Sequence, residues 1–476
     1  MTVTLNSNIE ISDVHPWFLA AIKRELTINN PDYAKKQAIG ISTWGLEEKI
    51  QLYRWEHYGT KLILPRGYLA RFMQLLRDCP HACFLTHQDN RVLHAPLSYP
   101  GYPDLRDYQK PAVKAAMENE QGCVIMPCGS GKTHCGMAIA ATVQQPTLWI
   151  THTLDLLQQA MTRAKETLGL TGDQLGVIQA ETMQPGTHMT FATVQTLFRR
   201  DLSELRDLFG CVIVDESHLC YKDAARARMF ESVISQLPAR YRFGLTASEH
   251  RADGLIETMF HVIGPKIFEV PQEQMNAAGN VVVPQVRFIE TDFRYAPDEG
   301  EMFNLQKMLI ALRGDYLRAV IEDEVIREAG AWAGTSVLVL GDSLEHLGRY
   351  HAALGDLSAF IHGGTPKKKR EALLQAVRDG KTQYLLATYQ LAKLGLDLPR
   401  LNRLVLLTPK RDKTSIQQAL GRTMRPFPGK TTPIVYDLWD RQTRQLNYWA
   451  RERKHVYADL GCQITGGPVI KSRKFY

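Results

Sequence analysis

The stretch CVIMPCGSGKTHCG, residues 123–136, decides the fold class. An apolar run that predicts a strand leads into a glycine-rich loop, and a helix is predicted to begin just after it. Glycines let successive backbone N–H groups curl round phosphate oxygens, and the N-terminus of the helix adds positive dipole. Lys132 is then placed to reach the β- and γ-phosphates of ATP, and Thr133 to hold Mg²⁺ through its hydroxyl. The predicted nucleotide-binding residues here are Gly129, Ser130, Gly131, Lys132 and Thr133.

A chance glycine loop is the alternative, because the strict phosphate-loop pattern has glycine where this chain has Met126. The position of the loop between a predicted strand and a predicted helix favours the nucleotide-binding interpretation.

A second apolar strand runs into two adjacent carboxylates in VIVDESHLC, residues 212–220. Burying a charge is costly unless it is paired or coordinates a metal. The ordinary explanation is a strand that ends at the surface. In a phosphate-loop enzyme, the strand that ends in Asp215 instead supplies the second Mg²⁺ contact, and Glu216 polarises the attacking water.

Short apolar strands alternate with helical stretches in two successive series, which predicts an α/β fold with parallel sheets in two tandem lobes. The predicted strands are 122–127, 146–151, 188–193, 210–216 and 242–248 in the first series, and 336–341, 358–363, 383–388, 403–408 and 433–438 in the second. We expect a small N-terminal α+β domain at 1–98, a first lobe at 99–275 and a second lobe at 276–476.

The N-terminal domain is predicted to contain a hairpin over 47–64 that turns at 58–60, and then a helix over 65–78. The apolar face of that helix is predicted to hold Leu69, Phe72, Met73 and Leu76. Residues 94–104, HAPLSYPGYPD, have the composition of a linker. Two roles stay open for the domain: packing against the first lobe, or engaging DNA with Trp44, Arg54, Trp55 and Arg66.

The net charge of +7 is unevenly spread, because residues 361–476 carry 23 Lys and Arg against 8 Asp and Glu. Such a block is typical of a polyanion partner, with a solvated surface as the alternative. No apolar run predicts a membrane span and no signal peptide is expected, so a membrane partner is not predicted. Eight cysteines in 476 residues do not form a disulfide framework, which favours a reducing cytoplasm. Zinc is not predicted, because Cys79, Cys83, His81 and His87 lack the usual ligand spacing.

The stretch QQALGRTMRP, residues 417–426, places Gln418, Arg422 and Arg425 at helical spacing on one face. A surface helix with two arginines is the ordinary explanation. An arginine supplied to a γ-phosphate in the transition state, however, is worth roughly 10³ to 10⁵ in rate.

These stretches, with LRDYQKPAV, ITHTLDLLQQA, FATVQTL, GLTAS and LATYQLAKLGLDLP, stand in the order of the superfamily 2 helicase motifs. The chain resembles that superfamily over roughly residues 100–460. Its stretch GLTASEHRADG is similar to the corresponding motif of the subgroup that holds UvsW-type phage branch-migration helicases, excision-repair translocases and restriction-enzyme motors. The resemblance implies two RecA-like lobes, ATP and Mg²⁺ as cofactors, and a monomeric DNA helicase or translocase. It also implies the cytoplasm of a bacterial, phage-infected or prophage-bearing cell.

The resemblance also implies roles for single residues. Arg106 and Gln109 would recognise adenine, and Gly395 and Asp397 would meet the nucleotide sugar and phosphates. His218, Thr246 and Ser248 would couple hydrolysis to lobe movement, although Ser248-Glu249 departs from the usual Thr-Pro pair. The expected contacts to the nucleic-acid backbone are Thr151, Thr193, Gln195, His362 and Thr388. An RNA helicase and a nucleotide-gated DNA-binding protein without activity remain as alternatives.

Overall fold

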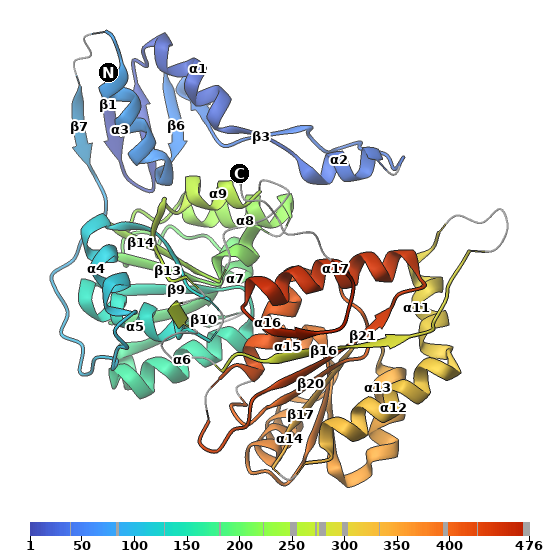
Figure 1. Cartoon of the computed structure of the whole chain (residues 1–476). Helices are drawn as coiled ribbons and strands as arrows, with labels where there is room; N and C mark the ends of the chain where they lie inside the picture. Colours follow the sequence, from blue (N-terminus) through green and yellow to red (C-terminus); the bar gives the residue numbers. More distant parts are fainter. Residues whose placement is uncertain are drawn as a thin grey trace. The chain divides into compact units, whose positions relative to one another are not determined.

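The computed structural model shown in Figure 1 describes most of the chain. The described residues are 1–38, 40–81, 85–127, 129–179, 182–221, 223–247, 255–271, 274–275, 282–297, 303–332, 334–393, 398–425 and 427–469. The chain divides into two compact units. The first unit comprises Met1–Pro127 and Gly131–Val270, and the second comprises Cys128–Ser130 and Pro271–Tyr476. None of the described helices has the length and apolar character needed to cross a membrane.

The first unit contains an eight-stranded sheet with the order β11-β10-β12-β9-β13-β14-β8-β15. Its strands are β8 (Gln121–Ile125), β9 (Thr147–Thr151), β10 (Leu175–Gln179), β11 (Thr182–Gln184), β12 (Met189–Thr193), β13 (Cys211–Asp215), β14 (Tyr241–Thr246) and β15 (Lys266–Glu269). All pairings in this sheet are parallel except that of β10 with β11. The five strands predicted for this lobe are confirmed, whereas β10, β11 and β15 were not predicted.

Helices connect these strands and pack on the sheet. They are α4 (Lys110–Asn119), α5 (Lys132–Val143), α6 (Leu154–Leu168), α7 (Val194–Phe198), α8 (Ala224–Ile234) and α9 (Leu255–Val262), with a 3₁₀ turn, η4, at Ser217–Tyr221. The strands β8, β9, β12 and β13 are buried along their length, as parallel strands covered on both faces must be. The carboxyl ends of β8 and β13 therefore bring the phosphate loop and Asp215 to one edge of the sheet.

The N-terminal part of this unit is a five-stranded sheet with the order β5-β6-β2-β1-β7. Its elements are β1 (Thr2–Leu5), β2 (Asn8–Ser12), α1 (Pro16–Glu25), β5 (Arg54–Glu56), β6 (Lys61–Pro65), α3 (Leu69–Asp78) and β7 (Thr86–Asp89). A two-stranded pair, β3 (Thr27–Asn29) and β4 (Lys49–Gln51), flanks α2 (Pro31–Ala38). The inner part of the predicted hairpin is present, with β5 antiparallel to β6, whereas its first residues form β4 and pair with β3.

The predicted apolar face of the helix after this hairpin is partly wrong. The helix α3 begins at Leu69, after a 3₁₀ turn, η2, at Arg66–Tyr68. Phe72 and Leu75 are its buried residues, whereas Met73 is 40% exposed. The buried residues Tyr68, Phe72 and Leu75 are four and three residues apart, so they define the packed face, and Leu69 and Leu76 lie partly buried at its sides.

The N-terminal sheet is fastened to the first lobe beside α8 and α9 (Figure 1) by two buried arginines. Arg66 donates to Gln121 Oε1 at 2.8 Å and to the Ala239 carbonyl at 2.6 Å. Arg242 of β14 donates in return to the Ser7 carbonyl at 3.1 Å. A Cβ atom on Gly67 would lie 2.4 Å from two carbonyl oxygens of α9, so only glycine allows this close approach.

The predicted linker is likewise held against the first lobe. The Tyr99 hydroxyl donates to the carbonyl of Gln145 at 3.1 Å, and the Leu97 N–H to that of Gln144 at 2.8 Å. The Gln145 side chain also accepts from the His94 N–H at 2.7 Å. The segment therefore packs on the first lobe and is hydrogen-bonded to it, and these contacts favour the packing role for the N-terminal domain.

Replacement of Arg66 by alanine is expected to lower the free energy of unfolding by at least about 3 kcal/mol. The substitution would leave Gln121 Oε1 and the Ala239 carbonyl buried without a donor, and a cavity beside them. Chemical denaturation measures the change, with Arg24→Ala as the control because that side chain is 74% exposed. A loss of less than about 1 kcal/mol would show that Arg66 does not fasten the domain to the lobe.

The second unit contains a seven-stranded sheet, ordered β18-β19-β17-β20-β21-β16-β22, whose pairings are all parallel in the described residues. Its strands are β16 (Gln285–Thr291), β17 (Val337–Gly341), β18 (Ser358–Ile361), β19 (Tyr384–Thr388), β20 (Arg403–Leu406), β21 (Ile434–Asp440) and β22 (Gln463–Thr465). Its helices include α11 (Leu305–Gly314), α12 (Tyr316–Gly330), α13 (Leu344–Leu354), α14 (Lys367–Arg378), α15 (Tyr389–Lys393), α16 (Lys413–Thr423) and α17 (Arg444–Asp459). The five predicted strands are confirmed, whereas β16 and β22 were not predicted. Both units are thus RecA-like α/β lobes, and the predicted fold class is confirmed.

Candidate nucleotide and nucleic-acid sites

The phosphate loop joins the end of β8 to the start of α5. Gly131, the residue before the helix, has a φ of +79°, in the left-handed region that favours glycine. A Cβ atom at this position would lie 2.7 Å from Gln109 Nε2, so the end of the Gln109 side chain would have to shift to admit it. Gly129 shares the left-handed conformation with a φ of +83°, and Ser130 is fully buried.

Four side chains meet where the phosphate loop faces the end of β13. Lys132 Nζ lies 3.5 Å from Glu216 Oε1, and the Thr133 hydroxyl donates to Asp215 Oδ2 at 3.3 Å. Lys132 is 8% and Asp215 4% exposed. The fold therefore brings the predicted phosphate-binding and carboxylate residues of the first lobe together.

The Asp215 carboxyl and the Thr133 hydroxyl fit a divalent cation. Burial, with the Glu216 carboxylate next to it, raises the pKa of Asp215. A cation neutralises such a carboxylate, and oxygen ligands are the ones Mg²⁺ prefers. The donor set thus supports the predicted Mg²⁺ contacts.

Glu216 has an unusual backbone, with a φ of +49° that non-glycine residues seldom adopt. Conformations of this kind cost of order 1–3 kcal/mol and cluster at active sites. The His218 Nδ1 atom lies 3.4 Å from Glu216 Oε2 and 3.0 Å from the Thr246 hydroxyl. His218 and Thr246, two of the predicted coupling residues, therefore contact each other next to the predicted base, while Ser248 lies outside the described residues.

The predicted adenine-recognition residues are tied to the phosphate loop. The Gln109 side chain accepts from the Arg106 N–H at 3.0 Å and donates to the Gly131 carbonyl at 3.5 Å. The Arg106 guanidinium donates to the Tyr108 hydroxyl at 2.9 Å. This arrangement would connect a base bound near Gln109 to the position of the loop, and adenine recognition stays a prediction.

The predicted nucleic-acid residues of the first lobe lie at the carboxyl ends of two neighbouring strands. Thr151 of β9 and Thr193 of β12 are partners in the parallel register. Their hydroxyls bond locally, that of Thr151 to the Thr153 carbonyl at 3.1 Å and that of Thr193 with the Thr196 N–H at 3.3 Å. These two threonines thus shape the backbone at the strand ends.

Gln195 contacts a residue that the sequence analysis did not single out. Its Nε2 atom lies 3.2 Å from His152 Nδ1, in the loop after β9. The position of His152 within ITHTLDLLQQA, directly after Thr151, was the available signal.

In the second unit, His362 and Thr388 also lie at the carboxyl ends of neighbouring strands, β18 and β19. His362 accepts from the Gly364 N–H at 3.2 Å, which shapes the loop before α14. Lys367, Lys368 and Lys369 at the start of that helix are exposed. Gly395 and Asp397 lie outside the described residues.

The helix α16 carries Gln418, which is 8% exposed, and Arg422. It ends at Thr423, so the prediction that Arg425 shares its face is wrong. The cause is Pro426, because a residue that precedes proline is disfavoured in helical conformation. Arg425 lies in the segment after the helix, where its carbonyl accepts from Lys430 Nζ at 2.8 Å.

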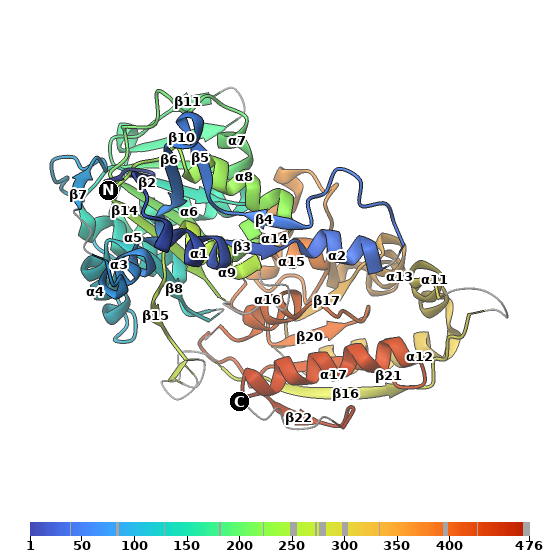
Figure 2. The same cartoon turned by 90° about the horizontal axis from the view of Figure 1, so that it is seen from above.

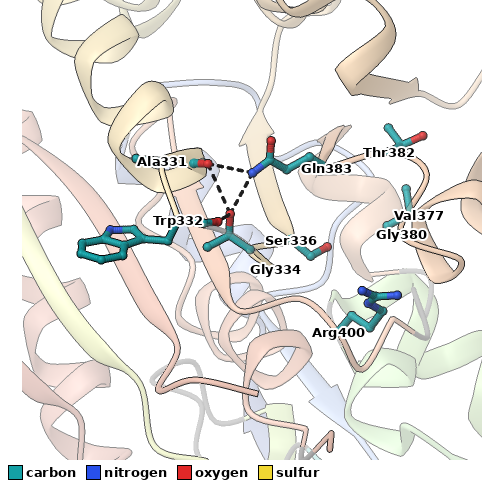
Figure 3. A pocket seen from close by; sticks show the side chains of 11 residues that line it. Ala331, Trp332, Gly334, Ser336, Val377, Gly380, Thr382, Gln383 and Arg400 are labelled. Atoms are coloured by element: carbon teal, nitrogen blue, oxygen red, sulfur yellow. Dashed lines mark hydrogen bonds between the residues drawn. The ribbon is translucent and has the colours of Figure 1, made fainter. Parts of the chain in front are cut away.

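A cavity of about 360 Å³ lies at the amino ends of strands of the second unit, away from the carboxyl ends that carry His362 and Thr388 (Figure 3). Gln383 spans one side of it and donates to the Gly330 carbonyl and the Thr335 hydroxyl, both at 2.8 Å. These residues precede β17 and β19, whereas His362 follows β18 and Thr388 is the last residue of β19. The cavity is therefore separate from the candidate site residues of its own lobe.

Two family models match the chain. The model described as type III restriction enzyme, res subunit, matches residues 102–251. The model described as helicase conserved C-terminal domain matches residues 331–426. The two matches fall on the first and second α/β lobes.

Curated relatives include a putative ATP-dependent RNA helicase, L396, of Acanthamoeba polyphaga mimivirus, 26% identical over 72% of this chain and 66% of that protein. The DNA 3'-5' helicase XPB of Mycobacterium tuberculosis is 28% identical over 75% of this chain and 64% of that protein. The chain thus spans slightly less than two thirds of the length of either relative.

Solved structures add a likeness of fold. Dbp5 of S. cerevisiae, bound to RNA and ADP BeF3, aligns with 75% of this chain and 89% of its own at a TM-score of 0.57 and 14% identity. T4 UvsW aligns with 98% of this chain and 99% of its own, at 18% identity and a TM-score of 0.42.

Proposed function

The chain belongs to the superfamily 2 helicases, and from this premise we propose that it is an ATP-dependent DNA helicase or translocase that remodels branched or damaged DNA. The observation that carries the proposal is the meeting of Lys132 and Thr133 with Glu216 and Asp215 at one sheet edge. A monomer in a bacterial or phage-infected cytoplasm belongs to the same proposal.

Each residue of the first lobe has a stated task in this proposal. Lys132, which contacts Glu216, would bind the β- and γ-phosphates, and Thr133 and Asp215 would hold Mg²⁺. Mg²⁺, when bound, neutralises charge on the phosphates. Glu216 then accepts the proton of the attacking water. His218 and Thr246 would transmit the change toward Gln418 of the second lobe.

Residues of the second lobe would complete the reaction and the grip on nucleic acid. Arg422 and Arg425 would stabilise charge on the γ-phosphate in the transition state. Gly395 and Asp397 would contact the sugar and phosphates of the nucleotide. Thr151, Thr193, Gln195, His362 and Thr388 would face the backbone of the bound strand, mainly through phosphate contacts.

DNA is the proposed polymer because the DNA 3'-5' helicases are among the relatives and residues 361–476 are strongly basic. RNA is the second candidate, because one relative is named as an RNA helicase. A nucleotide-gated binding protein without unwinding activity is the third. The complete set of Lys132, Asp215, Glu216, Arg422 and Arg425 argues against it.

ATPase activity is expected to be low without nucleic acid and strongly raised by DNA, with binding that weakens steeply as salt rises. The stimulation is measured as the steady-state rate of ATP hydrolysis with single-stranded DNA, duplex, fork, Holliday junction and RNA. Equal stimulation by RNA and DNA would favour the RNA helicase. Tight DNA binding without stimulated hydrolysis would favour the binding protein.

The N-terminal domain is proposed as an accessory that holds DNA as well as packing on the lobe. Trp44 is 93% exposed and Tyr58, at the tip of the β5–β6 hairpin, is fully exposed. Aromatic side chains of this kind stack on bases. Arg66 takes no part in such contacts, because it is fully buried against the first lobe.

A further inference from the structure

One face of α17 in the second unit carries two arginines with a tyrosine between them. Arg444, Tyr448 and Arg451 are spaced so that they lie on the same side of the helix, and all three are exposed. The buried residues of α17 lie on its other side and are Leu446, Trp449, Ala450, Arg453, Val456 and Tyr457. The exposed face is therefore separate from the packing face.

The packing face fixes the orientation of the helix. Arg453 forms two hydrogen bonds with the Asp437 carboxylate, both 2.7 Å long, and all of these groups are buried. The Tyr457 hydroxyl donates to the same carboxylate at 2.6 Å. Figure 2 shows α17 alongside β21 and β22, which it contacts. The exposed face is thus held in place before any partner binds.

A third arginine joins this face from another segment. The Arg411 guanidinium carbon, from the loop before α16, lies 5.5 Å from the centre of the Tyr448 ring. Attraction between a cation and an aromatic face is worth roughly 0.5–1 kcal/mol at exposed sites. We call this set of four residues the arginine stripe: Arg411, Arg444, Tyr448 and Arg451.

The arginine stripe differs from the cations around it because its arginines make no ion pair within the part of the chain that the structure describes. Neighbouring cations do: Arg441 pairs with Glu290 at 2.5 Å, Lys413 with Asp459 at 3.1 Å and Lys410 with Asp342 at 2.7 Å. Three like charges on one face repel one another, and a polyanion would relieve that repulsion.

We propose that the arginine stripe is a second nucleic-acid site, which binds backbone phosphates outside the segments that carry the helicase motifs. Guanidinium groups bind phosphate oxygens through two parallel hydrogen bonds, and the Tyr448 ring keeps Arg411 in position to do so. The stripe lies beyond the last motif in the chain, on a helix that contacts β21 and β22. His362 and Thr388 lie at the ends of β18 and β19, near the other edge of the sheet. This inference rests on the proposed function and adds a second site of contact with the nucleic acid.

The test compares two double variants of the full chain with equal loss of charge. Arg444→Gln with Arg451→Gln removes two stripe arginines. Arg287→Gln with Arg441→Gln removes two arginines of the same lobe that are paired with Glu328 and Glu290. Fluorescence anisotropy gives the affinity for single-stranded DNA, duplex and fork as KCl is varied, and thermal melting checks that each variant is folded.

The stripe variant is expected to bind DNA more weakly than wild type. The slope of log affinity against log salt should become shallower by about 1.4 units on single strands or about 1.8 units on duplex, for two lost phosphate contacts. The probe on which the slope changes tells whether strand or duplex occupies the stripe. The control variant is expected to keep the wild-type slope, and Tyr448→Phe to bind like wild type.

Two results would overturn the inference. The first is a stripe variant with wild-type affinity and slope on all three probes, which would point instead to an acidic protein partner. The second is an equal loss in both double variants, which would mean that only net charge matters. Failure of the wild-type chain to bind any probe would instead overturn the proposed function, so the two failures are distinguishable.

Discussion

Glu216→Gln is expected to lower kcat for ATP hydrolysis by at least about 100-fold while ATP and Mg²⁺ affinity changes by no more than a few-fold. Glutamine has nearly the same shape as glutamate and keeps a polar group next to Lys132 and His218, but it does not accept the proton of the attacking water. Asp215, Thr133 and Lys132, which would hold the nucleotide, are unchanged. Steady-state hydrolysis with saturating DNA, together with binding of a fluorescent ATP analogue, separates the two effects.

The structure gives this prediction a specific control. Glu118 is a largely exposed residue on α4 that pairs with Lys114, so Glu118→Gln should leave both parameters unchanged. Near wild-type turnover in Glu216→Gln would remove this residue from the mechanism. Loss of nucleotide binding in the same variant would mean that it positions Lys132 and does not act as the base, because the two side chains lie 3.5 Å apart.

Arg425→Ala is expected to lower kcat by about 1,000-fold, the low end for an arginine supplied to the γ-phosphate, and to keep ATP affinity within a few-fold. The reason is that the contact strengthens as charge develops in the transition state, so its loss affects turnover more than ground-state binding. The segment that holds Arg425 is fastened by Lys430, whose Nζ donates to the Arg425 carbonyl and to that of Pro399. The same hydrolysis and binding assays apply.

Arg441→Ala is the matched control, because Arg441 belongs to the same lobe and pairs with Glu290. It should hydrolyse ATP like wild type. A fall in ATP affinity equal to the fall in kcat/KM for Arg425→Ala would show that this arginine binds the ground state as strongly as the transition state. That outcome would contradict its proposed role.

The sequence by itself determined the two lobes and the phosphate-loop and carboxylate residues that lie together in the first lobe, which we propose as the nucleotide site. Buried parallel strands appear as short apolar runs, so ten strands could be predicted at nearly their observed positions. A phosphate loop requires glycine at positions such as Gly131, and a strand that ends in Asp215 and Glu216 requires a compensating cation. These constraints act on neighbouring residues, and a local pattern is enough to detect them.

The tertiary structure decided which polar groups are partnered, because that depends on residues far apart in the chain. In one of the two roles left open for the N-terminal domain, Arg66 was expected to engage DNA, yet it is fully buried against the first lobe, where it donates to Gln121 and to the Ala239 carbonyl. Arg441 and Arg444 are three residues apart and both exposed, and the position of Glu290 on β16 gives an ion pair to Arg441 alone of the two, among the described residues. The end of α16 at Thr423 was open to prediction from Pro426, since that restriction is local. Charge pattern along the chain fixes how many cations a lobe carries, whereas the packing of strands from distant segments fixes which of them remain available to a partner.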